Sequence, residues 1–339
     1  KSEEDFKKAG YKWTSLIKVV WEEFKSLYPQ LAVIAPALPP TVSPQPQETP
    51  SGQTQTDNLI RVGIWKVPQG QLISVSANGP YNVYDKNNQL VFSKQAGEKF
   101  SLDWSDDVWR KFVPQNDSVI MEIANYSDIP AWNQNLNYNR FRGSLEVRYS
   151  PKSQAVWMVN ELPLESYLRG VAEALSADSV EYQKAFAVIS RSYALFHLQA
   201  GGKYEGEIFH LNNTSSDQLY KGYVFEELVK DTLVKAVEAT AGLVMTYQGK
   251  VARALYSSDS GGQTVSACEK WGNEFCSDSY GYLKGGALDP PETVHNQSKI
   301  AASHGVGVSC IGARTLANQG KRYEEILKYY YWGVEIEKY

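Results

Sequence analysis

The spacing of apolar residues changes once along this chain, and that change limits the folds it can adopt. Between residues 59 and 150 apolar and polar side chains alternate in short runs, which is the pattern of half-buried β-strands. After Pro163 the apolar residues recur three or four positions apart, as they do on one face of a helix. Strands followed by helices predict an α+β fold and argue against a doubly wound parallel sheet. The alternating runs are LIRVGIW, QLISVSA, YNVYD, QLVFSK, VIMEIAN and SLEVRYS.

Helical spacing dominates the second part of the chain, with one interruption. Strands return at LVMTYQG and VARALYSS, on either side of a turn at Gln248 and Gly249. We expect a hairpin there, between helices that come before and after it. The predicted helices cover residues 164–175, 182–196, 226–240, 311–319 and 323–331.

The chain divides into three segments by composition. Residues 1–30 have the spacing of an amphipathic helix, which reads as a solvated spacer or as a contact for a partner or a membrane surface. Residues 31–58 are rich in proline and polar side chains, as expected of an extended linker. Residues 59–339 then form the main domain, with a β-rich part (59–154) and a core of mixed helices and strands (155–339).

The charge balance excludes one class of partner. The sequence has 34 Lys and Arg residues against 38 Asp and Glu residues, so no excess of positive charge is present to hold a nucleic acid. No run approaches the roughly 18 uninterrupted apolar residues of a membrane-spanning helix. Because the chain begins at Lys1 and not at Met, we expect a signal peptide or membrane anchor to have been removed upstream of residue 1.

Cysteine is scarce, with three residues in the whole chain. Cys268 and Cys276 are eight positions apart in a polar stretch, a spacing that allows a small disulfide-closed loop in an oxidising compartment. The sequence leaves open whether this disulfide forms. The cysteines lack the close pairs and neighbouring histidines of a structural zinc site.

Ten short sequence motifs follow one another along the chain. They are IRVGIW, ANGPYNVYD, FRGSLEVR, NELPLESYLRGVAEAL, KAFAVISRSYAL, DQLYKGY, AVEATAGLVMTYQGK, YSSDSGGQT, HGVGVSCIGA and YYYWG. In this order they resemble the SpoIID/LytB family of bacterial cell-wall proteins, over about residues 59 to 333. A single such word is weak evidence, but so many in one order make a chance resemblance improbable. The resemblance implies a SpoIID-like domain.

The resemblance also implies an activity. Family members include lytic transglycosylases, which cut the glycan strands of peptidoglycan, preferably strands stripped of their stem peptides, and leave anhydro-muramic ends. The family's acid maps onto Glu173, in the segment GVAEAL. One carboxyl group suffices, because the muramic sugar supplies its own 6-hydroxyl as the nucleophile, whereas ordinary glycosidases need two. The resemblance implies an extracytoplasmic location, in the wall or anchored to a membrane and facing it, and no cofactor.

From the residues alone, Glu173 is ambiguous. On the predicted helix it lies half a turn from the apolar stripe, so an exposed surface glutamate is the competing interpretation. Near the last turn it would face the negative end of the helix dipole, which should raise its pKa toward that of a useful acid. Glu161 and Glu165 are competing acids, which we rank second because they precede the helix or lie on its first turn.

The matching words also yield candidate contacts to the glycan. Arg191 should project toward the glycan or steady Glu173, unless it is a solvated helix arginine. His304 should bond to substrate or orient Glu173, unless it is structural. Phe186, Cys310 and Ile311 depart from the family pattern, which puts some of these contacts in doubt. The predicted substrate-binding residues are Arg191, Tyr193, Gln218, Tyr220, Tyr256, Ser257, Ser258, Ser260, His304 and Ser309.

Three other interpretations compete with this one. The DSGG word around Ser260 also surrounds the nucleophile of trypsin-like proteases, but no matching histidine or aspartate segment precedes it. A zinc-containing version of the family has Cys and His around the segment HLNNTSSDQLY; here Asp217 replaces a cysteine and only His210 is nearby, so we predict no metal. The third is a non-catalytic wall-binding module that activates a cell-wall amidase.

Overall fold

The computed structural model describes residues 58–339, and within them residues 58–129 and 135–339 belong to one compact unit. The predicted N-terminal helix and all but the last residue of the predicted linker lie outside the described residues. The unit combines several sheets with helices that follow most of the strands, which confirms the α+β class. Within the described residues no helix is long and apolar enough to span a membrane.

The largest sheet has seven strands in the order β11-β1-β10-β9-β6-β3-β4. Its neighbours pair antiparallel, except that β1 and β11 are parallel. Two of its strands, β10 and β11, come after the boundary that the sequence indicated at residues 154/155, so one sheet joins both parts. The strands are β1 (Leu59–Val67), β3 (Tyr81–Tyr84), β4 (Leu90–Lys94), β6 (Trp109–Pro114), β9 (Ser144–Ser150), β10 (Ala155–Pro163) and β11 (Leu211–Asn212).

A second, four-stranded sheet has the order β5-β2-β7-β8. Its central strand β2 is buried along its whole length, and its apolar side chains belong to the same core as those of the large sheet. Each of the six predicted runs contains an observed strand. The strands of this sheet are β2 (Ile73–Ala77), β5 (Phe100–Leu102), β7 (Met121–Ile123) and β8 (Arg140–Phe141).

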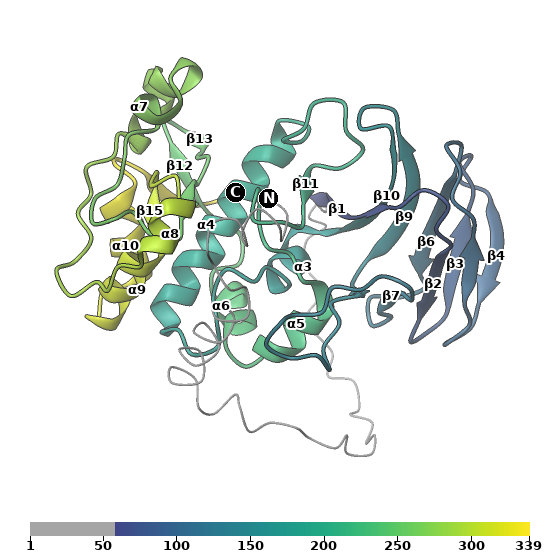
Figure 1. Cartoon of the computed structure of the whole chain (residues 1–339). Coiled ribbons are helices and arrows are strands. Elements are labelled where there is room, and N and C mark those ends of the chain that lie inside the picture. Colours follow the sequence, from purple (N-terminus) through teal and green to yellow (C-terminus); the bar gives the residue numbers. More distant parts are fainter. Residues whose placement is uncertain (1–57) are drawn as a thin grey trace, which may run out of the picture. The chain divides into compact units, whose positions relative to one another are not determined.

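Four helices follow strand β10, and the longest of them lies between the large sheet and the C-terminal part (Figure 1). This helix is α4, which packs against α3, α6, β12 and α10. It begins where the Ser179 side chain accepts a hydrogen bond from the Tyr182 N–H, as an N-cap does. The four helices are α3 (Leu164–Arg169), α4 (Val180–Gln199), α5 (Gly222–Val229) and α6 (Leu233–Ala239).

Two helix predictions in this region are wrong in their bounds. The predicted helix 164–175 ends at Arg169, and the predicted helix 226–240 is broken into α5 and α6. In the first case Gly170 lies against another segment of the chain: a Cβ there would be 2.7 Å from a ring carbon of Tyr220 and 3.0 Å from the Gly222 backbone. The chain therefore leaves the helix at this crossing.

The C-terminal part contains the predicted hairpin and the predicted last two helices. β12 and β13 form the hairpin, whose turn residues Gln248 and Gly249 both have positive φ, 51° and 71°. The sheet around β12 is completed by β16, and β14 pairs parallel with β15. The elements are β12 (Leu243–Tyr247), β13 (Lys250–Val251), β14 (Tyr256–Ser257), α7 (Ala267–Trp271), η2 (Asn273–Cys276), η3 (Asp278–Leu283), α8 (Gln297–Ala302), β15 (Val308–Ser309), α9 (Cys310–Asn318), α10 (Tyr323–Tyr330) and β16 (Glu335–Lys338).

Candidate active site

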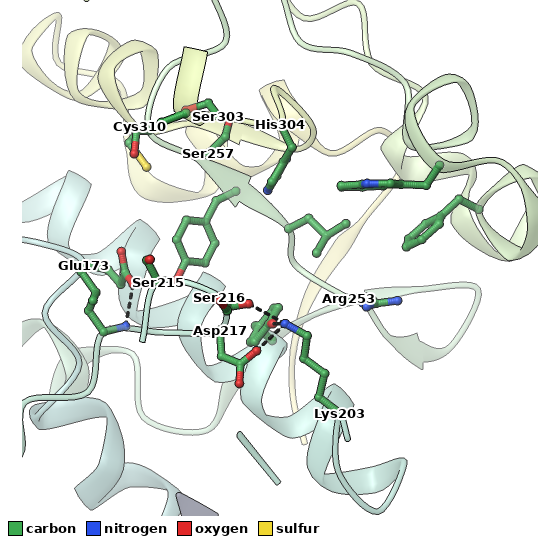
Figure 2. Close-up of a pocket in the computed structure, with 18 of the residues that line it drawn as sticks. Glu173, Lys203, Ser215, Ser216, Asp217, Arg253, Ser257, Ser303, His304 and Cys310 are labelled. Atoms are coloured by element: carbon green, nitrogen blue, oxygen red, sulfur yellow. Dashed lines mark hydrogen bonds and ion pairs between the residues drawn. The ribbon is translucent and has the colours of Figure 1, made fainter. Parts of the chain in front are cut away.

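A pocket of about 1000 Å³ lies between the end of α3, the side of α4 and the loops of the C-terminal part (Figure 2). Six of the eleven residues that the sequence indicated line it, and they come from segments far apart in the chain. These six are Glu173, Tyr193, Tyr256, Ser257, Ser258 and His304. The other lining residues are Lys203, Ser215–Asp217, Leu219, Arg253, Leu255, Trp271–Phe275, Ala302, Ser303 and Cys310.

Glu173 lies in a turn after α3, and not on the helix where we expected it. Backbone hydrogen bonds tie this turn to a distant segment: the Ala172 N–H donates to the Leu219 oxygen (2.7 Å), and the Lys221 N–H to the Gly170 oxygen (2.8 Å). The Leu219 N–H then donates to Oε1 of Glu173 at 2.9 Å. The carboxyl group is therefore held in place by the segment that crosses the turn.

The surroundings of Glu173 favour its protonated form. Burial raises the pKa of Glu173, and this outweighs the hydrogen bond from Leu219 and the nearby Tyr256 hydroxyl, which lower it. The direction agrees with the prediction, but the cause is desolvation and not a helix dipole. Burial, and then the Glu173 charge, raises the pKa of Tyr256 well above its ordinary value. Tyr256 therefore stays a hydroxyl donor beside the carboxyl group.

The two competing acids are committed to ion pairs outside the pocket. Glu161 accepts from Arg61 and Lys111, both at 2.6 Å, and although burial raises its pKa, these two cations lower it on balance. Glu165 pairs with Arg191. Neither carboxyl group lines the pocket, so neither is placed to protonate a ligand there.

Arg191 does not project toward the pocket, and the expectation that it would contact glycan or steady Glu173 is wrong. Its side chain is fully buried, so it is not a solvated arginine either. Nε and Nη2 bond the two oxygens of Glu165 at 2.7 and 2.9 Å, and Nη1 and Nη2 bond backbone oxygens of Leu243 and Val237. Arg191 thus joins α4 to α3, α6 and β12.

Gln218 and Tyr220 are also buried behind the pocket wall, so direct contact with substrate is excluded in this conformation. Gln218 accepts from the Tyr167 hydroxyl (3.0 Å), and the Tyr220 hydroxyl donates to Asn160 (2.8 Å). They flank Leu219, whose N–H bonds Glu173. Their role in this structure is to hold the segment that holds the acid.

Ser260 and Ser309 do not reach the pocket. Both hydroxyls donate to Oδ2 of Asp289, at 2.6 and 2.8 Å, and Ser309 also caps α9. No hydrogen bond among the described residues joins Ser260 to a histidine, which removes the protease-like interpretation. His295 bonds Asp259 instead.

Tyr256 and Ser257 form β14 at the floor of the pocket. Neither hydroxyl has a hydrogen bond of standard geometry to a described residue, although both are buried. The Tyr256 hydroxyl lies beside the Glu173 carboxyl group, and burial, and then this carboxyl group, raises the pKa of Tyr256. Phe186, one of the residues that depart from the family pattern, packs edge-to-face with Tyr256 (5.7 Å between centroids) and so supports it.

The close approach of β14 and β15 requires glycine at position 307. Its φ is +75°, and a Cβ there would lie 1.8 Å from the Leu255 oxygen. The preceding residues carry His304, whose Nδ1 accepts from the Val306 N–H at 3.0 Å. Burial, and then Lys270, lowers the pKa of His304. The ring is therefore neutral, with its proton on Nε2.

Lys203 and Asp217 form an ion pair in the wall. The ammonium group contacts Asp217 Oδ1, the Ser216 oxygen (2.5 Å) and the Tyr193 hydroxyl (3.2 Å), which uses its three donors. Asp217 Oδ2 accepts from the Asn212 N–H. Asp217, which stands where a zinc ligand was considered, is thus fully engaged, and His210 accepts from the Arg61 N–H. Lys203 follows two glycines after α4, and no sequence signal marked it.

One wall consists of residues 271–275, which sequence reasoning did not assign to the site. A disulfide between Cys268 and Cys276 closes the loop that carries them, which resolves the question that the sequence left open. Trp271 packs against His304 (5.2 Å between centroids). Cys310 lines the pocket as a free thiol whose pKa burial raises to about 12, whereas Ile311 does not line it.

Another group of potential metal ligands lies outside the pocket. Asp259, Asp289 and His295 place one ligand atom each within 4.8 Å of one another. Each carboxylate is already engaged: Asp259 by His295 and by the N–H groups of Gly261 and Asn296, and Asp289 by hydroxyl donors. These bonds hold the DSGG loop against its neighbours.

The comparisons with known proteins agree with the sequence words. Residues 152–247 match the model of the SpoIID family, described as a stage II sporulation protein. The chain carries a SpoIID domain. The match includes Glu173, Lys203 and Asp217 but ends before Tyr256 and His304. It supports a function related to the cell wall.

The chain also resembles a second protein over most of the length of both. An uncharacterized protein of Brachyspira hyodysenteriae (strain ATCC 49526 / WA1) is 27% identical over 365 aligned positions, which cover 83% of this chain and 94% of that protein. The similarity therefore extends well beyond the SpoIID domain, on both sides of it.

Proposed function

We propose that this protein is a peptidoglycan lytic transglycosylase in which Glu173 serves as both acid and base. The observation that carries the proposal is the buried carboxyl group of Glu173, whose pKa burial raises, at the wall of a pocket large enough for sugars. The other two acids that line the pocket are ion-paired, Asp217 with Lys203 and Glu274 with Arg253. This favours a reaction that needs a single free carboxyl group.

In the proposed reaction Glu173 gives its proton to the glycosidic oxygen as the bond to C1 of the muramic sugar breaks. The 6-hydroxyl of the same sugar attacks C1, and the Glu173 carboxylate takes the hydroxyl proton. The proton is thereby returned, no water is consumed, and an anhydro ring closes. Ordinary glycosidases require a second carboxylate as a base or nucleophile, which this route omits.

The remaining groups would hold the glycan. His304, Ser257 and Tyr256 line the pocket with polar groups, and the Tyr256 hydroxyl also lies beside the Glu173 carboxyl group. Ser258 and Tyr193 also line the pocket and remain predicted contacts. We propose that the substrate is a strand free of stem peptides, and that the protein acts outside the cytoplasm, facing the cell wall.

The test is mass spectrometry of the products from peptide-free glycan strands. The parent protein should release fragments with anhydro-muramic ends, and Glu173→Gln should release none while still binding the strands. Glu335→Gln, the same change at an exposed position on β16 that does not line the pocket, should cleave like the parent. Reducing ends would mean hydrolysis instead, and binding without cleavage by the parent would favour a module that activates an amidase.

A further inference from the structure

The two cations that line the pocket within the described residues differ in how far they are neutralised. Lys203 uses all three ammonium donors on protein acceptors, and its partner Asp217 is fully buried, so this charge is matched inside the protein. Among residues 58–339 Arg253 pairs with Glu274 alone, at 3.1 Å from Nη1, and the Glu274 side chain is 60% exposed. The Arg253 side chain is only 18% exposed, so the exposed member of the pair is Glu274, whose carboxylate can move into water when another anion takes its place.

The guanidinium group of Arg253 is held in place but poor in hydrogen bonds. It lies over the rings of Phe275 (5.1 Å) and Phe196 (5.8 Å), and its backbone N–H donates to the Tyr282 hydroxyl. Of its five N–H donors, one bonds Glu274; Nε is buried without a partner, and Nη2 bonds no described residue. The group is thus fixed in orientation, with its two terminal nitrogens still able to accept an anion.

A guanidinium in this state is suited to a carboxylate, which its planar pair of terminal nitrogens binds at two points. We propose that Arg253 binds a carboxylate of the glycan ligand through Nη1 and Nη2, displacing Glu274. This rests on the proposed function. A muramic sugar carries a free lactyl carboxylate only where its stem peptide has been removed, because the peptide converts that group into a neutral amide. Arg253 would thereby favour strands without stem peptides over strands that carry them.

The position of Arg253 fits this role. In Figure 2 it lies on the opposite side of the pocket from Glu173. A group that recognises a feature of the sugar without taking part in the chemistry is expected away from the acid. Glu274 belongs to the disulfide-closed wall, so this wall supplies the carboxylate that occupies Arg253 when the pocket is empty.

The test compares binding, not cleavage, in the Glu173→Gln background. The ligands are peptide-free strands, the same strands with their carboxyl groups converted into methylamides, and strands that keep their stem peptides. Peptide-free strands should bind about 10-fold or more tighter than their methylamides, the range of a charge-assisted pair. Arg253→Gln should remove this difference and leave affinity for the methylamide unchanged. If Arg253→Gln still discriminates, the proposal is wrong.

Two further variants separate recognition from packing. Glu274→Gln should tighten binding of the free-acid strands a few-fold because it removes the competing carboxylate, and this variant keeps Arg253 between its two rings. Arg253→Lys should retain part of the preference, because it keeps the charge but not the two-point geometry. If peptide-bearing strands bound most tightly, and this binding depended on Arg253, the ligand of Arg253 would be the carboxylate at the end of the peptide. That result would overturn recognition of the lactyl carboxylate. If the Glu274→Gln variant bound methylamide strands as tightly as free-acid strands, the proposal would be contradicted.

The outcome is independent of the cleavage assay. Carboxylate-dependent binding without any cleavage by the parent protein would support the subsite and overturn the transglycosylase. Cleavage of free-acid and methylamide strands at equal rates would support the transglycosylase and overturn the carboxylate subsite.

Discussion

The guanidinium of Arg191 forms a two-point ion pair with Glu165, with Nε–Oε1 and Nη2–Oε2 distances of 2.7 and 2.9 Å. The arginine side chain is fully buried, whereas that of Glu165 is 34% exposed. The two residues therefore depend on each other unequally. Glu165 without Arg191 can turn toward water, but Arg191 without Glu165 is a buried charge with no counter-charge.

Glu165→Gln should destabilise the protein strongly, by about 3–5 kcal/mol, because it leaves that charge uncompensated. Differential scanning calorimetry should show a fall of about 6–20 °C in Tm. Cleavage per folded molecule should be retained at low temperature, since neither residue reaches the pocket. A variant with normal Tm and no cleavage would assign a catalytic part to this pair.

Glu173→Gln should instead raise Tm by a few degrees near neutral pH. A carboxyl group whose pKa is raised by burial stabilises the fold below its unfolded pKa, and this contribution is lost as the pH rises through the folded pKa. Glutamine avoids that loss and still accepts from the Leu219 N–H. The Tm gain over the parent should therefore shrink in acid. Glu335→Gln should melt within about 2 °C of the parent at each pH; a Tm loss for Glu173→Gln would make Glu173 structural.

Tyr256→Phe should move the alkaline limb of the activity profile to higher pH. The Tyr256 hydroxyl lowers the pKa of Glu173, so its removal raises that pKa further and keeps the acid protonated over a wider range. The rate should fall at the same time, because a donor is lost. The measurement is kcat/KM against pH, with Tyr193→Phe as the control. The Tyr193 hydroxyl accepts from Lys203, so the alkaline limb of the Tyr193→Phe profile should stay at the pH of the parent. A limb that stays in place for Tyr256→Phe would exclude this coupling.

Local patterns were enough to predict most of the strands and the last helices, because alternation and helical spacing depend only on residues that are close together in the sequence. The central strand β10 was missed since it is buried on both faces for much of its length and lacks a clean alternation. The helix at residues 164–175 was extended too far because Val171 and Leu175 continue its apolar spacing. Leu175 is exposed, and the segment around Leu219 that ends the helix lies 46 residues away from Glu173.

The reach of local patterns also explains which predicted site residues line the pocket and which do not. Arg191 looked available because it falls off the apolar stripe of α4, but this helix is buried on nearly every side, including Ser190, Arg191 and Ser192. A stripe identifies an outward face only where the opposite face meets water. Arg253 and the wall 271–275 were missed for another reason: Arg253 lies in an apolar run that predicted only a strand, and only the cysteine spacing marked residues 271–275.

The disulfide between Cys268 and Cys276 should act on substrate binding more than on the chemical step. It closes the loop that carries Trp271, Glu274 and Phe275, which line the pocket, while Glu173 is held by a separate segment. The Cys268→Ser/Cys276→Ser variant should raise KM for glycan strands several-fold, with kcat within about two-fold of the parent, and lower the free energy of unfolding by about 2 kcal/mol. Steady-state kinetics with and without a reducing agent is the measurement: reductant should shift the parent toward the variant and leave the variant unchanged. A fall in kcat at constant KM would show that the wall takes part in the reaction itself.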